Sequence, residues 1–495
     1  MKIYKKIILI LLPLVFATTS CEEELNLTPR SLIGASSFWN TQGDVQGGLM
    51  GMYARFRVRT NSDFHLWGDG RSELLSYGLQ ASQGLEFFFE NTLDPNVYAG
   101  PNWKGLYTVL HDCNLLIANT PGIAFDDEAV KNDALAQAYT MRAYVNFIMV
   151  RVWGGVPIVT DPTEGFDPET TFKPRNTKEE VVNQIVLDLN EASTLFPKDE
   201  FTNGRSMWSK PAMNAFKGNF YLWKAKVMGG GTSDLTTALA ALEDVKVAGV
   251  DLLDNYDDIF RYTNKENNEV LMAVHYEDLE SGSNFNNAVY IRGDQIPSDG
   301  DPVAVALLGT GGGLNRIAPS ELFRDQWVDN DDTRKDATFV EVHTDDGSGN
   351  YTNYYGSAVL KYRGFVDAGS RKFMDDIILY RYADVLLMIA EAKNALDQDP
   401  TTEMNLVRAR AYGDNFAGHE FVNGSKAVND ELILKERLFE MAFEGRRWYD
   451  LLRFNKAFEL VPSLAGRGDY LKLFPISSGT ISQNSAIEQN PGYDD

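Results

Sequence analysis

Amphipathic helical segments recur along this chain, and each has an apolar face that a neighbouring helix must cover. In residues 127–152, for example, Leu135, Tyr139, Ala143 and Phe147 follow one another at the spacing of one helical turn. Similar patterns cover residues 41–57, 103–119, 178–196, 211–227, 235–247, 382–396 and 429–458. Helices of this length, arranged in pairs, predict a mostly α-helical fold with tetratricopeptide-like stacking, although the chain lacks a clean repeat of about 34 residues.

Local signals mark several helix ends. Thr177, with Glu180 three residues later, has the capping-box pattern before the helix of residues 178–196. Pro211 suits the first turn of the next helix, and the glycines of residues 229–231 end it. We therefore expect a helix, turn, helix order in this part of the chain.

Two segments differ in composition from the predicted helices. Residues 251–371 are rich in Gly, Asn, Asp and aromatic residues, and their strand-like stretches are short. Residues 60–101 form a second, smaller segment of this kind. Long irregular segments inside a compact domain are usually functional loops. We expect the two segments to be adjacent in space and to form an irregular lobe on the helical framework.

The N-terminus has the features of a secretory signal peptide. Three lysines precede an apolar run over residues 7–17, which ends in the small residues Thr18, Thr19 and Ser20. The run is shorter than the ~20 residues that a membrane span requires. Residues 1–20 are therefore predicted to be removed.

Cys21 directly follows the small residues, as in the lipobox of bacterial lipoproteins, although Thr18 stands where that motif usually has Leu. We expect Cys21 to be lipidated and residues 21–40 to form a lipid-bearing tether. The alternative is an ordinary cleavage site that leaves Cys21 as a free thiol. With Cys21 lipidated, Cys113 has no disulfide partner, so the fold must depend on its core.

Charge narrows the class of partner. The chain has 70 Asp and Glu residues against 46 Lys and Arg, which gives a net charge of -24. This excess argues against nucleic acid and against anionic lipid surfaces as partners.

The sequence offers little for catalysis. The histidines show no metal-ligand spacing and the chain has no G-x-S-x-G motif; the five are His65, His111, His275, His343 and His419. Glu440 and Glu444 lie one helical turn apart, but the arginines beside them predict ion pairs, as do Arg381 and Lys393 for Glu391. We predict no catalytic residue, no metal and no cofactor. Calcium at the Asp-rich turn of residues 345–350 is an alternative.

Aromatic residues are abundant in the irregular segments. An exposed ring can cover the apolar face of a sugar while Asn, Asp and Arg bind its hydroxyls, so the composition suits a glycan. By position and chemistry we name Trp67, Trp103, Tyr290 and Trp327 as candidate ligand platforms. For Trp103, which begins a predicted helix, a core position is the competing interpretation.

The C-terminal helical segment contains a specific motif. Residues 436–453 resemble the E-R-x-x-E-x-x-x-E-G-x-R-x-x-D-L-x-R signature of the SusD/RagB family. Further matching segments occur in the family's order at residues 103–107, 138–157, 381–387, 405–410, 473–476 and 489–493. The chain departs from the family at Ser477, where a second proline is usual. In the motif we expect the charged residues to tie the helix to its neighbours while Phe439, Phe443, Trp448 and Leu452 pack inward.

This resemblance implies an architecture. It divides the chain into an N-terminal SusD-like region, residues 41–250 with the insert 60–101, and a C-terminal region, residues 251–495. The latter would contain the ligand lobe 251–371, helices over 380–460 and an extended C-terminal segment. The expected fold is a tetratricopeptide-like α-α superhelix with a lobe of loops and short strands.

The resemblance also implies a function in nutrient uptake. Family members are non-catalytic, bind starch, other glycans or, in the RagB branch, peptides, and cover a SusC-like TonB-dependent transporter. We therefore expect a lipid-anchored protein at the surface of the outer membrane that binds a poly- or oligosaccharide. Residues 22–24, all Glu, resemble the export signal of Bacteroidetes lipoproteins. A RagB-like peptide-binding protein, a lipid-anchored glycoside hydrolase and a scaffold without ligand are the alternatives.

Overall fold

The computed structural model of the chain describes residues 38–61, 63–97, 100, 102–163, 165 and 171–493. The predicted signal peptide, Cys21 and the tether up to residue 37 lie outside these ranges. Every helix within them is either too short or too polar to serve as a membrane span.

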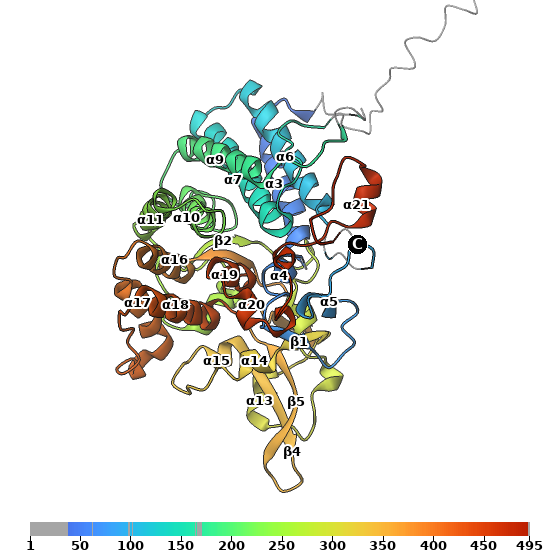
Figure 1. Cartoon of the computed structure of the whole chain (residues 1–495), viewed down its shortest axis with the longest axis vertical. Helices are drawn as coiled ribbons and strands as arrows, with labels where there is room; N and C mark the ends of the chain where they lie inside the picture. Colours follow the sequence, from blue (N-terminus) through green and yellow to red (C-terminus); the bar gives the residue numbers. More distant parts are fainter. Residues whose placement is uncertain are drawn as a thin grey trace, which may run out of the picture.

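Helices stack down the molecule in chain order (Figure 1). The stack packs α3 on α6, α6 on α7, α7 on α9, α10 on α11, α11 on α16, and α16 on both α17 and α18. These helices are α3 (Gln42–Thr60), α6 (Lys104–Asn119), α7 (Glu128–Trp153), α9 (Lys178–Leu195), α10 (Lys210–Val227), α11 (Thr232–Lys246), α16 (Tyr382–Ala395), α17 (Thr401–Tyr412) and α18 (Lys426–Met441). The predicted fold class, a mostly α-helical stack of tetratricopeptide-like pairs, is confirmed.

Most predicted helix ends are confirmed, and one predicted helix is wrong. The capping box of Thr177 and Glu180 is formed at the start of α9. Residues 429–458, predicted as one helix, are divided into α18, α19 (Arg447–Arg453) and α20 (Ala457–Leu460). The break between α18 and α19 contains Phe443 and Gly445 with φ of 62° and 70°. This left-handed conformation cannot continue an α-helix.

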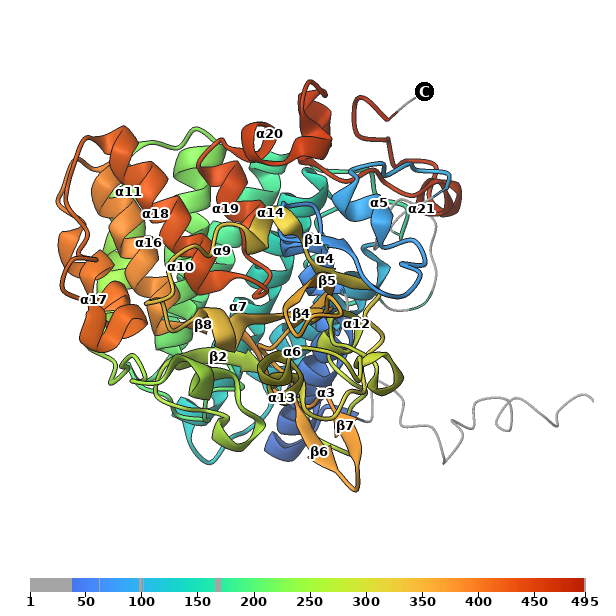
Figure 2. The ribbon, with the colours of Figure 1, turned by 90° about the horizontal axis from the view of Figure 1, so that it is seen from below.

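Short strands join the two irregular segments into one lobe. Strand β1 (Leu75–Tyr77) pairs antiparallel with β3 (Ile317–Pro319), with Leu75 opposite Pro319 and Tyr77 opposite Ile317. The predicted adjacency of residues 60–101 and 251–371 is therefore confirmed. The view from below shows the lobe strands on one side of the helices (Figure 2).

The lobe contains two further hairpins and several short helices. Hairpins form from β4 (Phe339–Asp345) with β5 (Tyr351–Val359) and from β6 (Phe365–Asp367) with β7 (Ser370–Lys372). Strand β2 (Val270–Val274) pairs with β8 (Ile377–Arg381), which leads directly into α16. The short helices of the lobe are α4 (Asp63–Gly68), α5 (Glu86–Phe89), α12 (Asn286–Val289), α13 (Pro302–Leu308), α14 (Glu321–Arg324) and α15 (Lys335–Thr338). A further short helix, α21 (Ser478–Gln483), lies outside the lobe, near the C-terminus.

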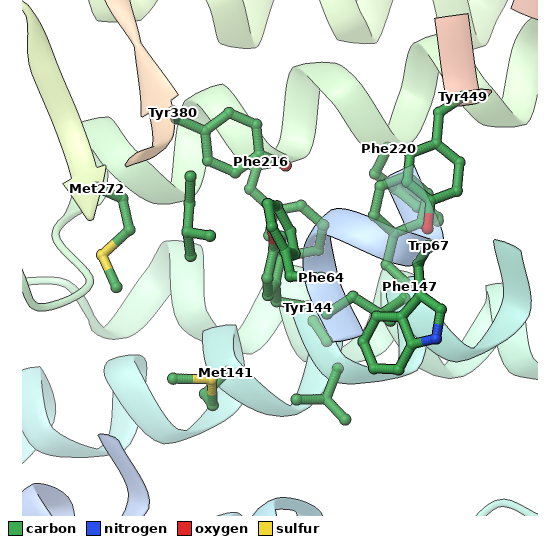
Figure 3. Close-up of a cluster of buried hydrophobic side chains, with 14 of the residues drawn as sticks. Phe64, Trp67, Met141, Tyr144, Phe147, Phe216, Phe220, Met272, Tyr380 and Tyr449 are labelled. Atoms are coloured by element: carbon green, nitrogen blue, oxygen red, sulfur yellow. The ribbon is translucent and has the colours of Figure 1, made fainter. Parts of the chain in front are cut away.

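Aromatic side chains from the first and last parts of the chain meet in the core (Figure 3). The rings of Tyr144 on α7 and Phe216 on α10 meet edge to face, with centroids 5.2 Å apart. The buried guanidinium of Arg151 lies 4.0 Å from the ring centroid of Phe147 and 3.8 Å from that of Tyr449 on α19. This cation–π arrangement places a charge in the core between two helices.

A buried ion-pair network surrounds the carboxylate of Glu440 on α18. Arg334, Arg381 and Arg410 donate to it over 2.9, 2.5 and 2.5 Å. Together with Glu444 the network contains five carboxylates and five cations; the other members are Asp332, Glu269, Glu436, Lys361 and Arg408. The prediction that Glu440 and Glu444 form ion pairs is confirmed.

The partners predicted for Glu391 are wrong. Its carboxylate accepts from Arg453 and Lys226, over 2.8 and 3.0 Å, whereas Lys393 pairs with Glu403. Glu391 and Lys393 are two residues apart on α16, so their side chains point to different faces of the helix.

Asp69, in the first irregular segment, forms hydrogen bonds with the turn between α18 and α19. The carboxylate of Asp69, just after α4, accepts from the backbone N–H groups of Gly445, Arg446 and Arg447 over 2.7, 3.1 and 3.0 Å. A Cβ atom on Gly68 would lie 1.9 Å from the carbonyl oxygen of Gly445. Only glycine at position 68 allows the two backbones to approach this closely.

Candidate functional site

The four aromatic residues named from the sequence are all buried, with at most 7% of each side chain exposed. Trp67 and Trp103 come together, because both meet the ring of Trp153, at centroid distances of 5.9 and 5.8 Å. Tyr290 and Trp327 lie in two other clusters of the core. The structure thus gives no support to these residues as a shared ligand platform.

The physical reason is that other core groups occupy the ring faces. Trp327 packs among Phe323, Phe339 and Phe439, and the hydroxyl of Tyr290 donates to the carbonyl oxygen of Leu308 over 2.6 Å. A ring enclosed in this way cannot stack on a sugar.

Exposed aromatic rings occur instead beside strand β3. Tyr77 on β1 is 56% exposed and Tyr354 on β5 is 47% exposed. The sequence contained a signal for Tyr354, because Tyr354 and Tyr355 are neighbours in a strand and must point to opposite faces. Tyr355 packs against the lobe core, and Tyr354 therefore faces solvent.

On the β1 side, Tyr77 is held by residues of α5. Its hydroxyl donates to the carboxylate of Glu90, and its ring meets the half-buried ring of Phe89 edge to face at 4.9 Å. The hydrogen bond to Glu90 raises the pKa of Tyr77, so the hydroxyl remains protonated at neutral pH. Tyr77 thus offers one ring with a carboxylate next to its polar end.

On the β5 side, Arg324 covers Tyr354. The guanidinium carbon lies 4.2 Å from the ring centroid, and Nε of Arg324 donates to Glu341 over 2.8 Å. The hydroxyl of Tyr354 donates to Oγ of Ser357 over 3.1 Å. Among the described residues, Nη2 of Arg324 has no hydrogen-bond partner, so it can donate to a ligand.

Strand β3 connects the two sides. Pro319 lies opposite Leu75 of β1, and its carbonyl oxygen accepts from Arg324 over 2.7 Å and from Ser357 over 3.1 Å. We call Tyr77, Phe89, Arg324 and Tyr354 the tyrosine seam. Its rings can cover apolar C–H faces, while the guanidinium of Arg324 and the neighbouring carboxylate of Glu90 can bind hydroxyls.

A few described residues have the chemistry of metal ligands. Asp329, Asp331 and His419 offer ligand atoms within 4.8 Å of one another. In the turn of residues 345–350, the carboxylate of Asp345 already accepts from the backbone N–H groups of Gly347 and Gly349 over 2.7 and 2.9 Å. These bonds fit a solvated turn closed by its own carboxylate.

The stacked helices and the inserted lobe define a tetratricopeptide-like α-helical protein. The model of the SusD family matches residues 324–472, and a second model, described as starch-binding and associating with the outer membrane, matches residues 73–222. SusD-like protein P38 of Formosa agariphila is 26% identical, and the match covers 100% of both chains.

Two solved structures have the same architecture over nearly the whole chain. NanU of B. fragilis is 32% identical, with 95% of this chain and 100% of that chain covered and a TM-score of 0.86. A SusD superfamily protein from Bacteroides vulgatus is 31% identical, with 92% of this chain and 100% of that chain covered and a TM-score of 0.84. The chain belongs to the SusD family, which confirms the resemblance seen in its C-terminal motif.

Proposed function

We propose that this protein is a cell-surface lipoprotein that captures a glycan and delivers it, without catalysis, to a SusC-like TonB-dependent transporter of the outer membrane. The exposed rings of Tyr77 and Tyr354 are the observation that carries the proposal. The starch-binding description of the matching family model supports a carbohydrate ligand, and its outer-membrane description supports the location.

The charge arrangement supports a binding protein rather than a hydrolase. General acid–base catalysis on a glycosidic bond needs two carboxyl groups that face the substrate. Glu440 and Glu444 of the family motif are instead buried in ion pairs with arginine and lysine. At the seam, Glu90 and Glu341 bind Tyr77 and Arg324.

An open seam also favours a glycan over a peptide, because a peptide-binding relative of the RagB type should have an enclosed groove. Two exposed rings and a few hydrogen bonds would supply roughly -4 to -6 kcal/mol, which corresponds to dissociation constants between mM and tens of µM. Weak capture of this kind permits transfer to a transporter.

Native gels that contain single polysaccharides would test the proposal. We expect one polymer to retard the mature protein without release of reducing ends, and the double variant Tyr77→Ala/Tyr354→Ala to migrate freely in the same gel. Tyr470→Ala is the matched control, because Tyr470 is also partly exposed, at 37%, but lies outside the lobe. Equal retardation of the double variant and the wild type would rule out the seam as the glycan site.

A further inference from the structure

Two carboxylates lie at the Tyr77 end of the tyrosine seam. Glu90 accepts from the hydroxyl of Tyr77. Glu86, one helical turn earlier, accepts from Oγ of Ser82 and from the backbone N–H of Gly84 over 2.6 and 2.8 Å. Neither carboxylate forms an ion pair within the described part of the chain. The hydrogen bond from Ser82 is the main reason that the pKa of Glu86 lies below its usual range, so Glu86 is ionised at neutral pH.

The pKa of Tyr77 reflects the charges at this end of the seam. The hydrogen bond to Glu90 is the main cause of the raised pKa, and the charges of Glu90 and Glu86 add to it. The undescribed residues of the first irregular segment, at positions 62, 98, 99 and 101, are Ser, Tyr, Ala and Pro, which carry no charge. The charges that act on the Tyr77 hydroxyl are therefore those of carboxylates.

At the Tyr354 end, the positive charge of Arg324 is balanced. Only 10% of the Arg324 side chain is exposed, and its Nε donates to the carboxylate of Glu341 over 2.8 Å. Nη1 donates to the carbonyl oxygen of Pro319, so the guanidinium is fixed against the ring of Tyr354. An anionic ligand at this end would have to compete with Glu341 for the charge of Arg324.

Two further arginines lie near the seam without compensating its carboxylates. Arg316 directly precedes β3, and Arg467 donates to the carbonyl oxygen of Asn91, the residue after Glu90, over 2.6 Å. Within the described chain, neither arginine forms an ion pair with Glu86 or Glu90. At longer range the net charge of the chain, -24, also repels anions. An anion at the Tyr77 ring would therefore meet two unpaired carboxylates.

The free hydrogen-bonding atoms of the seam match hydroxyl groups. Among the described residues, Oε2 of Glu90 has no hydrogen-bond partner and can accept, while Nη2 of Arg324 can donate. A sugar hydroxyl both donates and accepts, so it can bind to either atom. A carboxylate or sulfate group only accepts, so it leaves Glu90 without a donor and places a like charge beside it.

From these contacts we propose that the tyrosine seam selects neutral glycans and rejects glycans that bear carboxylate or sulfate groups. Glu90 and Glu86 are the residues that set this selectivity. The inference rests on the proposed function, because it names the class of glycan that the same site takes. It goes further in assigning the discrimination to two carboxylates that lie beside an exposed ring.

Matched pairs of polymers in native gels would test this inference on the full mature chain. The probes are amylopectin, xyloglucan, galactomannan and mixed-linkage β-glucan, each used unmodified and after oxidation of part of its primary hydroxyls to carboxylates. We expect the polymer that retards the protein to bind at least about tenfold more weakly after oxidation, because like charges that face each other at a binding site oppose association. The difference should shrink at high salt, where charges are screened within about 3 Å at 1 M.

The gels separate failure of this inference from failure of glycan capture. Equal or tighter binding of the oxidised form, or retardation by oxidised polymers alone, would overturn the selectivity and leave glycan capture standing. Retardation by no polymer in either form would overturn both. Retardation that survives in Tyr77→Ala/Tyr354→Ala would place the glycan, and with it any selectivity, outside the seam.

Charge-removing variants test the two carboxylates directly. The ratio of the affinities for the unmodified and the oxidised polymer should fall at least about threefold in Glu86→Gln/Glu90→Gln, because the repulsion is removed. Glu128→Gln/Glu200→Gln removes the same charge at positions outside the lobe that are 72% and 64% exposed, and should leave the ratio unchanged. Glu90→Gln alone gives the same readout if the double variant does not fold. A ratio that stays at the wild-type value in the seam variants would refute the assignment to Glu86 and Glu90.

Discussion

Replacing Glu440 with glutamine tests how the family motif holds the fold together. The carboxylate is fully buried and accepts hydrogen bonds from three guanidinium groups. Burial alone would raise the pKa of Glu440, but the charges of Arg410, Arg381 and Arg334 overcome this effect and hold it well below its usual range. Glutamine keeps the shape of the side chain and removes one of five balanced negative charges.

The expected cost is large. Removing one partner from a buried ion pair typically costs 3–5 kcal/mol, because the charge left behind remains away from water. We therefore expect Glu440→Gln to lower the free energy of unfolding by about 3–5 kcal/mol at pH 7. Urea unfolding followed by circular dichroism would measure the change, with the slope against denaturant checked for constancy.

Glu431→Gln is the control for this experiment. Glu431 lies on the same helix, but 69% of its side chain is exposed and its nearest cation, Lys456, is 3.9 Å away. Surface changes of this kind usually shift stability by no more than about 0.5 kcal/mol. A loss below about 1 kcal/mol for Glu440→Gln would refute the argument, because it would mean that water screens the network.

Three further predictions concern pH, the core and the anchor. Burial alone would raise the pKa of Glu391, but Arg453 and Lys226 lower it from 4.5 to about 2, so its ion pairs stabilise the protein above pH 4.5 and are lost as the pH falls toward 2. In Glu391→Gln, the free energy of unfolding should fall by up to about 3 kcal/mol less than in the wild type as the pH is lowered through this range. The same dependence of the unfolding free energy on pH in the variant and the wild type would contradict this prediction. Trp327→Ala should lower the free energy of unfolding in urea by about 3–5 kcal/mol and leave glycan retardation of the folded protein unchanged. Normal stability together with lost retardation would instead support Trp327 as a ligand platform. Cys21→Ser should move the protein from the membrane fraction to the soluble fraction, since two or more acyl chains are needed for stable anchoring, and retention in the membrane would argue against lipidation.

Sequence periodicity was sufficient for most of the framework and failed where local patterns are weak. Periodicity did not indicate helix α17, which lies in the range that the resemblance assigns to helices, because its buried residues are few and include the ion-paired Glu403. The break between α18 and α19 was missed because it depends on a tertiary partner: Asp69, far away in sequence, binds the N–H groups that the turn exposes. Family resemblance located the motif but not this contact.

The candidate site was harder to predict, because exposure of an aromatic ring is a tertiary property. Trp67 and Trp327 lie in irregular segments, as expected for platform residues, yet neighbouring core rings cover them. The pair Tyr354 and Tyr355 was a signal for one exposed ring, since adjacent side chains of a strand point to opposite faces and one face of this hairpin is open to solvent. The pairing of Tyr77 with Phe89 and Glu90 required the fold of α5.

The contact between Asp69 and the turn before α19 also orders events during synthesis. The carboxylate of Asp69 and its first backbone partner are separated by 376 residues, so this carboxylate gains its hydrogen bonds from the turn only after most of the chain has been made. Contacts at such long sequence separation form slowly, and the incompletely folded chain exposes apolar surface until they have formed. A nascent chain that ends before residues 443–447 would therefore leave the carboxylate of Asp69 without its backbone partners.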